Sequence, residues 1–179
     1  MFADGRSKKV VFIAHCLLNQ NAISDGTAVF PAAFRDVIQT FLDAEIGIVQ
    51  MPCPELCCLG LDRGDRCGAC RPVTEENTRI RRAMGSDSAS QILMRLADHV
   101  IQQILEYHKY GFEIVGIVGA NRSPNCGVET TSENNRELPG KGIFMEELSR
   151  RLQSQQLSIP MLGLKASDHT AEKVQSLIK

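Results

Sequence analysis

The sequence contains no tryptophan and only two tyrosines. Proteins that bind single-stranded nucleic acids stack the bases on aromatic side chains, and this chain has few such side chains to offer. The formal net charge is -1 and the isoelectric point is about 6.4, whereas a nucleic-acid-binding domain usually has a strongly basic face. The sequence therefore predicts that no nucleic acid is a partner.

A long apolar run is also missing. A membrane-spanning helix needs roughly 18 or more consecutive apolar residues, and no segment approaches this length. Residues 1–9 are largely polar and lead directly into an apolar strand, without the apolar region of a signal peptide. We therefore expect no membrane partner and a cytoplasmic location.

What is present is typical of a globular protein. The chain has 179 residues, of which 43% are hydrophobic and 23% charged, and this length and composition suit one compact domain with a sizeable core. No internal repeat or linker divides the chain. We expect a single domain over residues 1–179.

Seven cysteines stand out in this composition. In a cytoplasmic protein we expect them to be reduced, because disulfides persist mainly in oxidising compartments. Their number and location therefore favour metal binding, catalysis or simple burial over structural disulfides.

Apolar runs alternate with segments of helical periodicity along the chain. Continuous apolar runs indicate strands buried on both faces, and apolar residues three and four positions apart indicate amphipathic helices. The expected strands are residues 8–14, 46–51, 113–119 and 159–164, and the expected helices are residues 28–44, 89–110, 143–153 and 170–178. This alternation predicts the α/β class, as a small Rossmann-like three-layer domain with a mostly parallel sheet of about four or five strands.

The segment from about residue 54 to residue 88 differs in composition from the rest of the chain, because it is rich in glycine, cysteine and charged residues. Irregular segments beyond about 15 residues are uncommon in compact domains unless they are functional or mobile. We predict a long cysteine-rich loop beside the ligand-binding crevice, with a short helix near residues 75–84. Its arginines, Arg63, Arg66 and Arg71, could meet a substrate phosphate or carboxylate, but the default expectation is that they are solvated.

Three of the cysteines, Cys16, Cys53 and Cys126, each follow an expected strand. Parallel strands place their carboxyl ends, and the ligand-binding crevice, at one edge of the sheet, so these thiols can meet in space. A tripod of thiolates would leave one position open on a tetrahedral metal, or one iron of a 4Fe–4S cluster without a protein ligand. The alternative is that they are small buried hydrophobic residues at strand ends.

Polar residues accompany two of these cysteines. Glu55, in the stretch Pro52–Glu55, can serve as a general acid or base in a crevice, or can be a solvated loop glutamate. Ser123 can hydrogen-bond a ligand or a water, or can be a turn-forming serine before a proline. His15, next to Cys16, is expected to have a structural role.

The stretches His15–Asn19, Pro52–Glu55 and Ser123–Gly127, in this order and each after a strand, resemble the thiouracil desulfidase family, formerly a domain of unknown function. The resemblance implies that Cys16, Cys53 and Cys126 hold a 4Fe–4S cluster with one open iron. It also implies that Glu55 and Ser123 are catalytic.

The resemblance further implies a thiolated small-molecule substrate, such as a thiopyrimidine. In the implied non-redox mechanism, a water activated by Glu55 attacks the carbon that carries the sulfur, which leaves as hydrosulfide. The family usually has Ser-Ala before the first cysteine and Gly-Gly-Leu-Pro after the glutamate, where this chain has Ala14-His15 and Leu56–Leu61. These differences indicate a sister branch.

A second set of cysteines supports a different interpretation. Cys67 and Cys70 form a Cys-x-x-Cys stretch, with Cys57 and Cys58 upstream. Such thiols can hold a structural zinc or form a redox pair. The alternative function is therefore a zinc-stabilised binding or interaction module that uses the Cys67/Cys70 loop.

Overall fold

The computed structural model describes residues 2–178 and is built on a parallel sheet of four strands. The strands are β1 (Lys9–Ile13), β2 (Gly47–Gln50), β3 (Glu113–Ala120) and β6 (Met161–Leu164), and their order in the sheet is β2-β1-β3-β6. The predicted α/β class and parallel sheet are confirmed.

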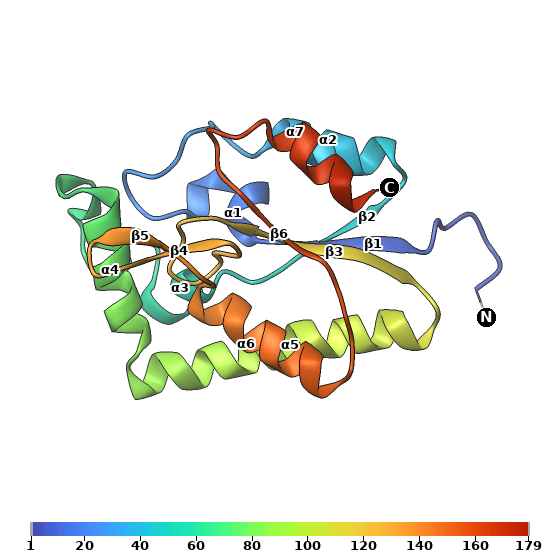
Figure 1. Cartoon of the computed structure of the whole chain (residues 1–179). Coiled ribbons are helices and arrows are strands. Elements are labelled where there is room, and N and C mark those ends of the chain that lie inside the picture. Colours follow the sequence, from blue (N-terminus) through green and yellow to red (C-terminus); the bar gives the residue numbers. More distant parts are fainter. Residues whose placement is uncertain (1, 179) are drawn as a thin grey trace.

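Helices cover both faces of this sheet and make three layers (Figure 1). Helices α2 (Arg35–Asp43) and α7 (Thr170–Val174) pack together on one face. Helices α5 (Asp87–Lys109) and α6 (Ile143–Ser154) pack together on the other. A short 3-10 turn, Gln175–Leu177, follows α7.

The two central strands form the middle of the core. Val11, Phe12 and Ile13 of β1 and Ile117 and Val118 of β3 have no exposed surface. Because helices cover both faces, these strands read as continuous apolar runs rather than as alternating ones. Full burial of each large apolar side chain stabilises the fold by about 1.5–3 kcal/mol.

Helix α5 shows how local signals set the bounds of an element. Ser86 is its N-cap and accepts a hydrogen bond from the backbone N–H of Ala89, and Asp87 lies in the first turn, where a negative charge is favourable. The helix stops before Gly111, whose φ of 73° is costly for other residues. The prediction of a helix over residues 89–110 is confirmed within two residues.

Beyond the carboxyl ends of the strands lies a set of short elements (Figure 1). They are α1 (His15–Leu18), a 3-10 turn (Gln20–Ala22), α3 (Pro54–Leu59), a second 3-10 turn (Gly68–Cys70), α4 (Val73–Met84) and the antiparallel hairpin of β4 (Thr130–Glu133) and β5 (Arg136–Pro139). These elements build the walls around the strand ends.

The helix predicted near residues 75–84 is confirmed as α4, but the prediction that the rest of residues 54–88 is an irregular loop is wrong at its start, where α3 lies. Helix α3 begins with Pro54 at its first position, where the missing N–H costs nothing, and the sulfur of Cys53 accepts a hydrogen bond from the N–H of Leu56. Helix α4 buries the polar side chains of Glu76, Asn77 and Thr78. It therefore lacks the continuous apolar stripe that would have shown its full length.

The helix expected over residues 28–44 begins only at Arg35. The preceding residues bond to another segment: the side-chain oxygen of Gln20 accepts from the N–H of Val29, and the carbonyl oxygen of Ala32 accepts from the N–H of Gln20. These tertiary hydrogen bonds replace the intrahelical ones, so the apolar spacing of residues 28–34 was misleading.

The β4–β5 hairpin was not predicted. Its turn residues, Asn134 and Asn135, both have positive φ, of 52° and 60°. Asparagine tolerates this conformation, and two such residues form the turns that suit two-residue hairpin loops. The Asn-Asn pair was the available signal.

Among residues 2–178, no helix has both the length and the apolar character that crossing a membrane requires.

We expect Gly127→Ala to destabilise the loop that carries Cys126. An added Cβ would overlap the carbonyl oxygen of Thr130 and lie 2.8 Å from that of Ser123. Overpacking of this kind costs about 1–3 kcal/mol, which urea denaturation followed by circular dichroism would measure. Gly5→Ala is the control, because its Cβ would meet nothing within 4 Å. Equal stability of the two variants would contradict the tight packing of this loop.

Candidate functional site

A cavity of about 290 Å³ lies at the carboxyl edge of the sheet. It is lined by all five residues that the sequence singled out, namely Cys16, Cys53, Cys126, Glu55 and Ser123. These residues come from three separate parts of the chain, so the tertiary structure brings together what the sequence separates.

Strand register explains how two of the cysteines meet. Ile13 of β1 pairs with Gln50 of β2. Cys16 lies three residues after Ile13, and Cys53 lies three residues after Gln50. Cys16 then falls in the first turn of α1, and Cys53 becomes the N-cap of α3. Both sulfurs are therefore presented at the same level beyond the sheet.

Cys126 reaches the same place by a backbone reversal. The chain turns after β3, where the N–H of Ser123 donates to the carbonyl oxygen of Ala120. It then returns, because the N–H of Ala120 donates to the carbonyl oxygen of Cys126 at 2.9 Å. This bond fixes Cys126 beside the end of β3, although it lies six residues further along the sequence.

The three thiols are free and share one desolvated environment. Burial raises the pKa of Cys16 to about 12 and that of Cys53 to about 11. Burial also raises the pKa of Cys126 well above its usual value, and the charges of Cys16 and Cys53 add to this effect. Cys16 keeps partial exposure as a residue, yet desolvation remains the main cause of its raised pKa.

Glu55 is buried rather than solvated, with 8% of its surface exposed. One carboxylate oxygen accepts a hydrogen bond from the side-chain amide of Asn125 at 2.9 Å. The other accepts from Nε of Arg63 at 3.2 Å. Two donors from distant segments therefore hold the carboxylate at the wall of the cavity.

Ser123 combines the two roles considered for it. Its Oγ accepts hydrogen bonds from the backbone N–H groups of Cys126 at 2.9 Å and Asn125 at 3.2 Å, as a turn-forming serine does. Because Oγ is an acceptor in both bonds, its own proton is left for a group in the cavity that it lines.

His15 lies beside the site but does not line the cavity. Its Nδ1 pairs with the side-chain amide of Gln50 at 2.7 Å, so the neutral ring carries its proton on Nε2. Burial, followed by the charge of Arg63, lowers the pKa of His15 and favours this neutral form.

Arg63 is a residue of the cavity wall that sequence reasoning did not place there. The prediction of a solvated loop arginine is wrong, since only 2% of Arg63 is exposed and it lines the cavity. Its guanidinium contacts the carboxylate of Glu55 and lies 3.7 Å from the sulfur of Cys53. Nothing in the local sequence distinguishes it from the exposed Arg66.

The expectation that all seven cysteines are reduced is wrong for one pair, because Cys67 and Cys70 form a disulfide. Two cysteines belong neither to this disulfide nor to the cavity. Cys57 is exposed, and the thiol of Cys58 donates to the carbonyl oxygen of Ala89. The disulfide engages both sulfurs that the zinc alternative requires, so in this state the loop offers a metal no thiolate from that pair.

Within residues 2–178, no group of three or more His, Cys, Asp or Glu side chains converges on the position of one metal ion. The three cavity thiols therefore do not form a mononuclear site in this arrangement. A 4Fe–4S cluster makes a different demand, since each thiolate binds a different iron and the sulfurs are spread around the cluster. Three free thiols on the walls of one cavity fit that donor set.

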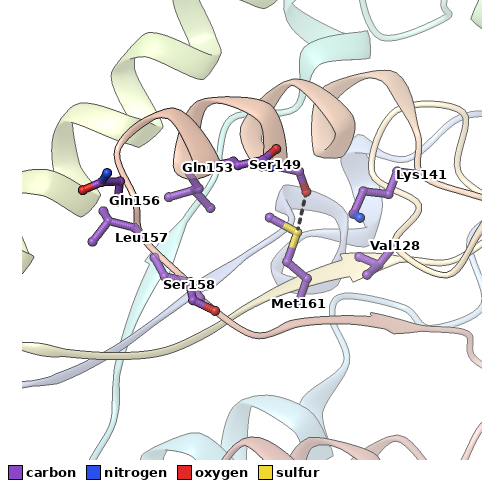
Figure 2. Close-up of a pocket in the computed structure, with 10 residues that line it drawn as sticks. Val128, Lys141, Ser149, Gln153, Gln156, Leu157, Ser158 and Met161 are labelled. Atoms are coloured by element: carbon purple, nitrogen blue, oxygen red, sulfur yellow. Dashed lines mark hydrogen bonds between the residues drawn. The ribbon is translucent and has the colours of Figure 1, made fainter.

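A larger hollow of about 500 Å³ lies elsewhere, between the end of α6 and β6 (Figure 2). Its lining includes Lys141, Ser149, Gln153 and Met161, and Ser149 donates to the sulfur of Met161 at 3.3 Å. No cysteine or carboxylate lines it. It therefore lacks the chemical groups that the strand-end cavity concentrates.

Comparison with known proteins found one relative and no assigned family. The chain is similar to "Uncharacterized protein MJ0003" of the archaeon Methanocaldococcus jannaschii, with 26% identity over 148 residues, covering 83% of this chain and 80% of the relative. No protein-family model matches the chain, and no solved structure matches it. The similarity extends over most of both chains, and the relative's name states no activity.

We expect the cavity cysteines of the metal-free protein to resist alkylation at neutral pH. Only the thiolate reacts, and a raised pKa keeps Cys16 and Cys53 protonated until the pH approaches 11 to 12. Iodoacetamide labelling of these two cysteines, quantified for each cysteine by mass spectrometry, should stay low at about pH 7 to 9 and rise only as the pH approaches 11 to 12. The exposed Cys57 is the internal control and should react at neutral pH. Fast neutral labelling of Cys16 and Cys53 would contradict the desolvated site.

Proposed function

We propose that this protein is an iron–sulfur-dependent desulfidase that removes sulfur from a thiolated small molecule, such as a thiopyrimidine, by non-redox hydrolysis. One observation carries the proposal. Three free cysteines from three strand ends share one cavity with a buried carboxylate and a serine hydroxyl. The sequence resemblance to the thiouracil desulfidase family supports the same conclusion.

Cys16, Cys53 and Cys126 would hold the 4Fe–4S cluster. When bound through three thiolates, the cluster supplies an open iron that acts as a Lewis acid toward the substrate's sulfur. Because burial keeps the three thiols protonated in the metal-free protein, binding must release their protons. The cationic iron–sulfur core would offset most of the charge of the three thiolates.

Glu55 serves as the general base. Its carboxylate accepts a proton from a water in the cavity, and that water's oxygen attacks the carbon that carries the sulfur. The carbon–sulfur bond then breaks as the added hydroxyl becomes a carbonyl, and the proton of that hydroxyl passes to the sulfur, which leaves as hydrosulfide. Glu55 later releases its proton to solvent, and no electron is gained or lost. Asn125 and Arg63 hold the carboxylate in one orientation, which a general base needs in order to reach its proton.

Ser123 and the cavity wall orient the substrate. The hydroxyl proton of Ser123 is directed to a polar atom of the ligand. Apolar side chains of Leu17, Val29 and Phe34 and amides of Gln20 and Asn77 line the same cavity. A mostly apolar wall with a few placed polar groups suits a small, flat heterocycle.

Iron binding tests the cofactor. After anaerobic reconstitution, the wild-type protein should be brown and contain about four irons and four sulfides per chain, as a cluster of this type requires. Cys16→Ser, Cys53→Ser and Cys126→Ser should each lose the colour and most of the iron. Cys57→Ser is the matched control, because Cys57 is exposed, and it should keep both. A colourless wild-type protein that contains stoichiometric zinc would contradict the proposal.

Hydrosulfide release tests the reaction. With a panel of thiolated pyrimidines, Glu55→Gln should lower kcat by about 10²- to 10⁴-fold, the usual contribution of a general base, while iron content stays at the wild-type level. The exposed Glu75→Gln is the control. If Glu55→Gln released hydrosulfide at the wild-type rate, Glu55 would not be the base.

A further inference from the structure

The guanidinium of Arg63 uses all of its hydrogen-bonding capacity inside the protein. It has five N–H donors. Nη1 bonds the carbonyl oxygens of Gly60 at 2.8 Å and Leu61 at 3.0 Å, and Nη2 bonds that of Ala22 at 2.6 Å. The remaining two donors meet the carboxylate of Glu55 and the sulfur of Cys53.

The three carbonyl contacts set the orientation of the guanidinium without help from the cavity. They come from neutral backbone groups, two in the loop of Arg63 itself and one at the end of the 3-10 turn Gln20–Ala22. Consequently, the other two donors are aimed at Glu55 and Cys53 by the fold itself. A buried charge is costly unless it is paired, and Glu55 is the only carboxylate that forms an ion pair with Arg63 among the described residues.

Arg63 is held in a backbone conformation that is unfavourable for residues other than glycine. Arg63 has a φ of 54°, a conformation that costs a non-glycine residue roughly 1–2 kcal/mol. Its carbonyl oxygen is held by Arg79 at 2.9 Å, and Arg79 is itself paired with the buried Glu76. These contacts hold the strained residue in place, so that its side chain enters the cavity wall.

We infer that Arg63 is a positioning residue that fixes the orientation of the Glu55 carboxylate and that, through its hydrogen bond and its positive charge, stabilises negative charge on the sulfur of Cys53. The inference rests on the proposed function, because it assigns Arg63 a role toward the group that the three cysteines would hold. Arg63 acts through Glu55 and Cys53.

Two measurable properties follow. Hydrogen bonds to ligating sulfurs and a nearby positive charge both raise the reduction potential of an iron–sulfur cluster. Removal of Arg63 should therefore shift the potential to more negative values. Removal of Arg63 should also leave the carboxylate of Glu55 without a fixed orientation. We expect this to lower kcat more than it changes KM, because many other residues of the cavity wall would still contact the substrate.

The test compares Arg63→Met and Arg63→Lys with Arg66→Met. Arg66→Met is the control, because Arg66 lies only three residues away in the chain and its side chain is exposed. Each protein is reconstituted anaerobically and examined for iron content, melting temperature, cluster potential by redox titration, and hydrosulfide release. Arg63→Met should give a more negative potential and a kcat lower by roughly tenfold or more. Arg63→Lys keeps the charge but loses the planar fork, so its potential should be closer to the wild-type value while kcat stays low. Arg66→Met should match the wild type.

Two results would overturn the inference. One is a wild-type potential and kcat in Arg63→Met. The other is a lower melting temperature and iron content in Arg63→Met with an unchanged potential in the protein that does load, which would make Arg63 a scaffold for its loop. If the wild-type protein binds no iron, the proposed function fails first, and this is read from the wild type alone.

Discussion

Parallel pairing of β1 with both β2 and β3 is the constraint on which the site depends. The backbone N–H of Met51 donates to the carbonyl oxygen of Ile13, and that of Ala14 donates to the carbonyl oxygen of Val118. These two bonds, each 2.8 Å long, align the ends of three strands at one edge. Without that alignment, Cys16, Cys53 and Cys126 would remain far apart, as they are in the sequence.

The second constraint is electrostatic. A cavity that gathers three thiols and a carboxylate accumulates negative charge as soon as the thiols ionise, and a desolvated interior makes such charge expensive. Arg63 supplies the compensating charge from a strained loop, and Asn125 supplies a neutral donor to Glu55. The pairing of the strands and the placement of these donors therefore both determine the geometry of the cavity at the carboxyl edge of the sheet.

Sequence reasoning succeeded where local patterns and burial agree. The apolar runs of β1 and β3 and the stripe of α5 identify themselves because each is buried in the way that its periodicity implies. It failed where tertiary contacts override the local pattern. The segment before Arg35 has helical spacing, yet its backbone bonds to Gln20. Helix α3 was not predicted, because it begins at Pro54 in a stretch that has the composition of a loop.

The sequence by itself determined the fold class and the positions of the main strands and helices. It also indicated which five side chains to examine, because strand-then-cysteine is a local pattern and Glu55 and Ser123 lie close to two of these cysteines in the chain. Only the tertiary structure decided that these side chains line one cavity, that Glu55 is buried, and that Cys67 and Cys70 are joined. It also separated Arg63 from Arg66, two loop arginines alike in their local surroundings. The physical reason is that burial and hydrogen-bond partners are set by segments distant in sequence, here by Ala22 and Glu55 for Arg63.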